Sequence, residues 1–192
     1  MWPLLGISIV ALAVLIERFL YYAQCRFPSK GFAAVVEQSL ATGSIAPLEK
    51  ALSTVPALRN FTHILATPHH PHREAALQAA GEGVLRSLEQ RLPLLRVLGQ
   101  IAPLLGLLGT VLGMIATFSR IASAPSGVDM GMLADGIWQA LITTATGISI
   151  AIPIVLCLSL LQNRVRRVRS ALADAGNTAL LLWKDADGTQ AS

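Results

Sequence analysis

Charged side chains are scarce in this sequence of 192 residues. Only 14% of the residues are charged, 53% are apolar, and the mean hydropathy is +0.58. A water-soluble domain carries about 25% charged residues, and a disordered chain combines low hydrophobicity with high charge. The composition therefore excludes both an ordinary soluble domain and intrinsic disorder, and it predicts an integral membrane protein.

The sequence has only two cysteines and lacks several motifs of common enzymes. Cys25 and Cys157 lie far apart, so neither a disulfide framework nor a zinc site can be built from them, and we expect both thiols to be reduced. The sequence contains no P-loop, nucleophile elbow or HExxH motif. We therefore expect neither an enzyme active site nor a cofactor.

Four histidines lie close together in the sequence: His63, His69, His70 and His72. Histidine tracts can bind metal ions, but no matching carboxylate or cysteine set accompanies them and Pro71 interrupts their spacing. We favour a solvated loop and expect no metal site.

Basic residues outnumber acidic ones by 15 to 11, which gives a formal net charge of +4. They flank long apolar runs, which indicates membrane topology and not a nucleic-acid surface. Nine lie in residues 17–96, one in 120–135 and five in 164–192. By the positive-inside rule, the long loop and the tail face the cytoplasm, whereas the short loop and the N-terminus face outside. Four arginines after the last apolar run are also candidates for contact with anionic membrane lipid: Arg164, Arg166, Arg167 and Arg169.

Three segments have the length and composition of membrane spans. Residues 97–119 and 136–163 contain no Asp, Glu, Lys, Arg or His, and a span needs about 20 residues. The first segment is uncharged only over residues 1–16. It extends further if Glu17 and Arg18 reach the interface or face protein.

We expect this first segment to be a retained span and not a cleaved signal peptide. It begins without a basic residue, and Trp2, Tyr21 and Tyr22 resemble interfacial anchors. The sequence thus predicts an all-α membrane protein with long cytoplasmic helical extensions. Its predicted segments are a first span at 1–24, a cytoplasmic helical loop at 25–96, a second span at 97–119, a periplasmic loop at 120–135, a third span at 136–163 and a cytoplasmic tail at 164–192.

The segments outside the spans also have helical patterns. Short amphipathic stretches at 32–40 and 47–52 are separated by Thr42-Gly43-Ser44, which is typical of a helix stop followed by a capping serine. Residues 73–96 predict one long helix that runs into the second span, and Pro93 and Pro103 are candidates for kinks in it. Two apolar stripes support these helices: Leu77, Val84, Leu88 and Leu92 before the second span, and Val165, Val168, Leu172 and Ala175 after the third.

Small residues recur on one face of each of the last two spans. Such stripes mark places where membrane helices approach closely, either within one chain or around an oligomer. The second span carries Ala102, Gly106, Gly109 and Gly113, and the third carries Gly136, Ala140, Thr144, Gly147 and Ala151.

Threonines lie beside these stripes: Thr110 and Thr117 on the second span, and Thr143, Thr144 and Thr146 on the third. Each hydroxyl can simply bond the carbonyl one turn back. Alternatively, the two tracks line a narrow wet path or receive a polar group from a partner. Because neither run contains a carboxylate, lysine, arginine or histidine, a proton path through them needs a titrating group from another chain.

Two segments of the sequence resemble a known family. Residues 101–114 (IAPLLGLLGTVLGM) resemble the second-span signature of the MotA/TolQ/ExbB proton-channel family. Residues 136–148 (GIWQALITTATGI), followed by Ala151-Ile152-Pro153, resemble its third-span signature. Within the family the chain is most similar to the ExbB branch, with TolQ close behind; MotA proteins have four spans.

The resemblance implies a subunit of a motor stator in the bacterial inner membrane. Such subunits form a homo-oligomer, a pentamer, around an ExbD-like dimer whose membrane aspartate carries the proton, and the complex energises TonB and uptake across the outer membrane. Thr110 and Thr144 match the family threonines that face this aspartate, and Thr117 and Thr143 extend the expected pore lining. The matching packing positions are Pro103, Gly106, Gly109, Gly113 and Gly147, and we add Ala140 and Ala151.

One position departs from the family pattern. Many members place a glutamate just before the Ala-Leu pair of the third span, where this chain has Gln139. An amide forms hydrogen bonds but does not titrate near neutral pH, so a role that needs this acid is in doubt here. A TolQ-like envelope function and a non-conducting membrane scaffold remain the alternatives.

Overall fold

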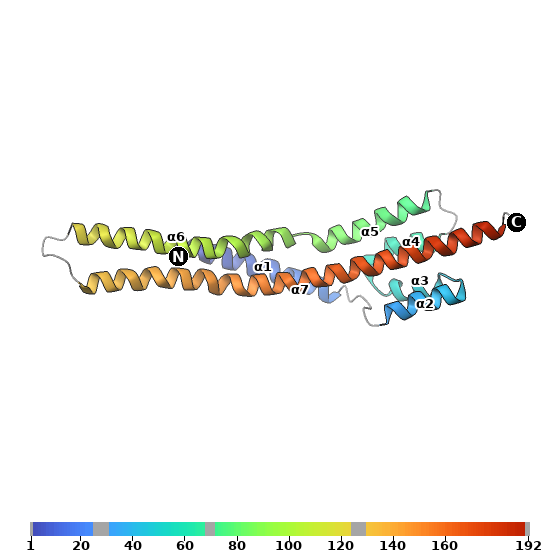
Figure 1. Ribbon diagram of the computed structural model, residues 1–192, viewed down its shortest axis with the longest axis horizontal. Coiled ribbons are helices and arrows are strands. Elements are labelled where there is room, and N and C mark those ends of the chain that lie inside the picture. Colours follow the sequence, from blue (N-terminus) through green and yellow to red (C-terminus); the bar gives the residue numbers. More distant parts are fainter. Residues whose placement is uncertain (1, 25–30, 68–71, 124–129, 191–192) are drawn as a thin grey trace. The chain divides into compact units, whose positions relative to one another are not determined.

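The computed structural model describes residues 2–24, 31–67, 72–123 and 130–190, which fold into helices (Figure 1). Cys25, His69 and His70 lie outside these ranges. The described part of the chain contains no strand, in agreement with the all-α prediction. Its elements are α1 (Trp2–Gln24), α2 (Phe32–Thr42), α3 (Ala46–Ser53), the short 3-10 helix η1 (Pro56–Leu58), α4 (Arg59–Leu65), α5 (Arg73–Glu89), α6 (Leu92–Ala122) and α7 (Met130–Gln190).

Three helical stretches are long and apolar enough to cross a membrane: Trp2–Ala23, Arg73–Ala122 and Met130–Asp185. The first coincides with the span predicted at 1–24 to within one residue at each end, and the other two contain the spans predicted at 97–119 and 136–163. The predicted fold class is therefore confirmed. The third stretch belongs to α7, which continues far past the apolar run without a break. The exact ends of the spans and the side of the membrane on which each loop lies stay predictions.

The long helix expected over residues 73–96 is instead two helices. α5 ends at Glu89, α6 begins at Leu92, and Arg91 between them has a left-handed φ of 68°. Pro93 lies in the first turn of α6. A continuous helix would place its ring against the carbonyl of Glu89, four residues earlier, and would leave that carbonyl without a donor. Pro103, by contrast, is accommodated inside α6.

The chain divides into two compact units. The first, which we call the span unit, comprises Met1–Arg18 and Arg91–Leu160. The second, the loop unit, comprises Phe19–Gln90 and Leu161–Ser192. Each unit has its own buried residues, and they are described separately.

In the span unit, α6 and the first part of α7 lie side by side and antiparallel (Figure 1). The close contacts recur every seven residues, a period typical of left-handed helix packing. They pair Gly99 with Ile154, Gly106 with Gly147, and Gly113 with Ala140.

The span unit also buries one face of α1, which includes Leu4, Ala11 and Val14. Arg18 continues this face and is only 4% exposed, while the Glu17 carboxylate contacts both Arg18 and Arg91. Arg18 therefore faces protein, which is one of the two placements that the sequence left open.

The loop unit has a core of leucines and two phenylalanines, Phe32 and Phe61, from its short helices. α3 packs against α2 and α4, and α4 packs against α5. Gly43 ends α2 in the left-handed conformation, as predicted. The N-cap of α3 is Ile45 and not the predicted Ser44, whose hydroxyl oxygen accepts a hydrogen bond from the Ala46 backbone N–H at 3.3 Å.

Leu77, Val84 and Leu88 of the stripe predicted before the second span are buried on α5, whereas Leu92, also buried, begins α6 in the span unit. The stripe predicted on the end of α7 is buried, which confirms it. The core side chains include Leu48, Leu52, Leu58, Phe61 and Leu65.

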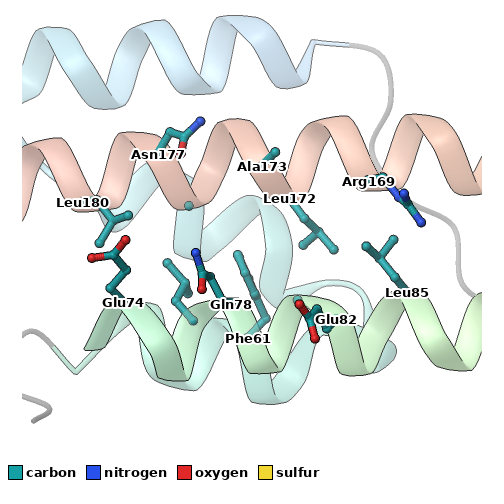
Figure 2. Close-up of a pocket in the computed structure, with 13 residues that line it drawn as sticks. Phe61, Glu74, Gln78, Glu82, Leu85, Arg169, Leu172, Ala173, Asn177 and Leu180 are labelled. Carbon is teal, nitrogen blue, oxygen red and sulfur yellow. The ribbon is translucent and has the colours of Figure 1, made fainter. Parts of the chain in front are cut away.

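A pocket of about 380 Å³ lies between α5 and the last part of α7 in the loop unit (Figure 2). Glu74 and Glu82 from α5 and Arg169 from α7 lie at its walls. Gly176 also lines it, and a methyl group added there would lie 3.6 Å from the Leu77 Cδ2 atom. This is an ordinary contact distance, so the pocket has room for the methyl group.

We expect Gly176→Ala to raise the free energy of unfolding by about 0.5–1 kcal/mol, because alanine is favoured over glycine within a helix. Thermal or chemical unfolding in detergent measures this change. Gly83→Ala on α5, where an added methyl group meets nothing within 4 Å, should give a gain of similar size. A loss of stability in Gly176→Ala alone would show that the pocket between α5 and α7 is smaller than the structure has it.

Candidate functional site

A backbone carbonyl of α6 is the centre of a threonine cluster in the span unit. The Thr144 hydroxyl of α7 donates to the Gly106 oxygen at 3.0 Å, and the Thr143 hydroxyl lies 3.3 Å from the same oxygen. A methyl group at Gly106 would lie 3.0 Å from the Thr143 carbonyl oxygen and 3.1 Å from the Thr144 Cα atom. The glycine therefore allows the helices to approach closely enough for these hydrogen bonds between them.

Thr110 joins the cluster from the α6 side. Its hydroxyl oxygen lies 3.3 Å from that of Thr144 and 2.6 Å from the Leu107 carbonyl oxygen. The two hydroxyl groups thus have only two hydrogens for three contacts, with Leu107, with Gly106 and with each other. Since a hydroxyl both donates and accepts, the pair can redirect a hydrogen towards an acceptor that enters the site.

The structure places Thr117 apart from this cluster. Its hydroxyl donates to the Gly113 carbonyl at 2.8 Å, and its Cβ atom would lie 2.7 Å from a methyl group on Gly136. Thr117 is seven residues from Thr110, which is about 10 Å along a helix. Of the four threonines predicted to line a pore, Thr143 and Thr144 therefore reach the Gly106 carbonyl and Thr110 joins them through Thr144. The fourth lies towards the end of α6.

The predicted packing residues lie at or near the contact between α6 and α7. A methyl group on Gly147 would lie 2.7 Å from the Ala102 carbonyl oxygen, and one on Gly109 would lie 2.9 Å from the Thr143 Cβ atom. Ala140 and Ala151 are buried, whereas Pro103 is half-buried in the interior of α6. Gly99 makes a contact of the same kind, with Ile154, and was not predicted. Its spacing of seven residues from Gly106 could have indicated this contact.

Gln139 lies on an exposed part of α7 and donates a hydrogen bond of 2.9 Å to the Asp135 carboxylate. Both side chains line a pocket of about 340 Å³ between α6 and α7. Gln139, at the position where many family members have a glutamate, thus forms a hydrogen bond with an acid one turn earlier on the helix. Asp135 was not among the residues predicted from the sequence, although it is the acid that borders the uncharged run at its N-terminal end.

The histidines show no metal site in the part of the chain that the structure describes. His63 and His72 are exposed, and among the described residues no group of three His, Cys, Asp or Glu side chains is placed to hold a metal ion.

Comparison with known proteins identifies the family. The sequence pattern of the MotA/TolQ/ExbB proton channel family matches residues 41–174, which is more than half of the chain. The biopolymer transport protein exbB1 of Vibrio cholerae is 34% identical over 170 residues, which cover 84% of this chain and 74% of the relative. A putative biopolymer transport protein, ExbB-like 3, of Synechocystis sp. is 31% identical over 162 residues, covering 80% and 76%.

A third relative carries a different name. The Tol-Pal system protein TolQ of Haemophilus influenzae is 36% identical over 102 residues, which cover 53% of this chain and 43% of the relative. The family consists of membrane transport proteins and not of enzymes, which confirms the expectation that the chain is not an enzyme. With its three apolar helices and this match over most of its length, the chain belongs to the MotA/TolQ/ExbB proton channel family.

Proposed function

We propose that this protein is an ExbB-like proton-channel and stator subunit of a bacterial inner membrane. With an ExbD-like partner it uses the proton-motive force to energise TonB-dependent transport across the outer membrane. The names of the Vibrio and Synechocystis relatives, each matched over most of the chain, support this branch of the family.

The observation that carries the proposal is a polar cluster in a helix pair without an acid or base of its own. Thr143 and Thr144 lie at the Gly106 carbonyl and Thr110 lies beside Thr144, while residues 97–119 and 136–163 contain no carboxylate, lysine, arginine or histidine. Hydroxyl groups can solvate a carboxylate in either protonation state. The cluster is therefore suited to receive the membrane aspartate of a partner helix.

The remaining features of the complex follow from this assignment. The subunits form a pentamer around the partner helices, with Thr110 and Thr144 towards the partner aspartate and Thr117 and Thr143 along the path. The N-terminus and the loop at 120–135 are periplasmic, and the loop at 25–96 and the tail at 164–192 are cytoplasmic. Each proton that crosses a potential of 100 mV releases about 2.3 kcal/mol for mechanical work.

Reconstitution into liposomes tests the proposal. The complex of this protein with the single-span protein that copurifies with it should conduct protons, whereas this protein alone should not, because its own spans supply no titrating acid or base. Changing the partner's membrane aspartate to asparagine should abolish the flux. Equal flux with and without the partner would contradict the proposal, and so would a complex that does not conduct.

A TolQ-like role in the envelope is the second candidate, and the match to the Haemophilus relative favours it. The two roles differ in the phenotype of a deletion strain. Loss of an ExbB-like subunit should impair growth on limiting iron, whereas loss of a TolQ-like subunit should cause sensitivity to detergent. A scaffold without ion flow would keep its activity when the membrane potential is dissipated.

A further inference from the structure

A pocket with polar walls leads from the ends of α6 and α7 into the span unit. It has a volume of about 340 Å³, and a water molecule needs on the order of 10–15 Å³ of such space together with polar partners. Thr117 and Arg120 line it from α6, and Asp135, Gln139 and Thr143 line it from α7. The pocket therefore has both the room and the hydrogen-bonding groups to hold several waters.

Among the described residues on the walls of this pocket, Asp135 is the only carboxylate and Arg120 is the only other charged residue. The Asp135 side chain is exposed, and one of its oxygens accepts the 2.9 Å hydrogen bond from the Gln139 amide. This bond uses one acceptor site and leaves others on the carboxylate. The carboxylate can consequently bind a proton while Gln139 keeps it against the pocket wall.

The pocket reaches one member of the threonine cluster, Thr143. Thr143 lines the pocket and lies within hydrogen-bond distance of the Gly106 carbonyl, which also accepts the Thr144 hydrogen bond. Along α6 the lining extends from Arg120 to Gly109, which is about 16 Å at 1.5 Å per residue. The pocket thus connects an exposed carboxylate with the site that is proposed to receive the partner's acid.

We propose that Asp135 collects the protons that enter this channel. Its carboxylate binds a proton from a hydronium ion at the pocket mouth and leaves a water molecule; the acid then releases the proton to pocket water and becomes a carboxylate again. The proton passes along this water to Thr143 and onward to the partner's carboxylate. This step rests on the proposed function. It assigns the binding and release of the proton to Asp135, because the Gln139 amide cannot titrate.

The test compares variants of the reconstituted complex in liposomes that contain a pH-sensitive dye. Asp135→Asn retains a side chain that can bond Gln139 but cannot carry the proton. It should lower the flux about tenfold, which is the lower end of the effect that charged groups in a cleft have on the rate at which ions arrive. Asp174→Asn, on the same helix but in the loop unit, should conduct like the unsubstituted complex.

A second variant separates the loss of the carboxylate from a change in structure. Adding Gln139→Glu to Asp135→Asn returns a carboxylate to the same pocket one turn further along α7, and it should restore most of the flux. Unchanged flux in Asp135→Asn, or no recovery in the double variant, would overturn this inference while the proposed function stands. An unsubstituted complex that does not conduct would overturn both.

Discussion

Thr144→Val should lower the proton flux of the reconstituted complex by about 10- to 100-fold. Valine has nearly the same shape as threonine but lacks the hydroxyl group that donates to the Gly106 carbonyl and contacts Thr110. A hydrogen bond to a charged group is worth about 1.5–3 kcal/mol, and each 1.36 kcal/mol on a barrier changes a rate tenfold. A dye-based flux assay measures the effect in the same liposomes as the unsubstituted complex.

Two further variants show whether the hydroxyl group at this position is the cause. Thr144→Ser keeps the hydroxyl and should retain most of the flux. Thr146→Val removes a hydroxyl that bonds only the Ile142 carbonyl of its own helix, and it should have little effect. If Thr144→Val and Thr146→Val lower the flux equally, the threonine cluster at Gly106 is not the site that handles the proton.

Apolar runs and their spacing were sufficient to predict the membrane helices. The three candidate spans follow from length and hydrophobicity alone. The structure has the second and third within long helices, and the first matches α1 from Trp2 onwards. The apolar stripe at Val165, Val168, Leu172 and Ala175 also predicted that α7 continues past its span, because all four side chains lie on one buried face.

The end of α5 and the acceptor at the site could not be predicted in the same way. Pro93 is compatible either with a kink or with the start of a new helix, and the left-handed Arg91 shows that a new helix begins. The threonine cluster depends on the Gly106 carbonyl. Every residue has a backbone carbonyl, so residue types alone do not identify which one is the acceptor. Only the register between α6 and α7 brings the Gly106 carbonyl within reach of Thr144.

That register makes Gly147→Ala the second change with a large expected effect. The added methyl group would lie 2.7 Å from the Ala102 carbonyl oxygen and 3.0 Å from the Gly106 Cα atom, which are backbone atoms that cannot rotate away. Overpacking of this kind costs about 1–3 kcal/mol, and the rigid obstacle places this site at the upper end of that range. The free energy of unfolding in detergent should fall by about 2 kcal/mol, because the preference of a helix for alanine offsets only about 1 kcal/mol of the cost.

Gly176→Ala is the matched control, since it makes the same substitution on the same helix. Helix propensity predicts a gain at both positions, so only the space around each glycine distinguishes them: an ordinary 3.6 Å contact at Gly176 and a backbone clash at Gly147. Stability should therefore rise in one variant and fall in the other. Because separating α6 from α7 also pulls Thr144 from the Gly106 carbonyl, Gly147→Ala should lose proton flux together with about 2 kcal/mol of stability. Thr144→Val should lose flux with only about 0.6 kcal/mol of stability, the average for a hydrogen bond between membrane helices. A Gly147→Ala protein as stable as Gly176→Ala would mean that the two helices do not approach as closely as the hydrogen bonds to Gly106 require.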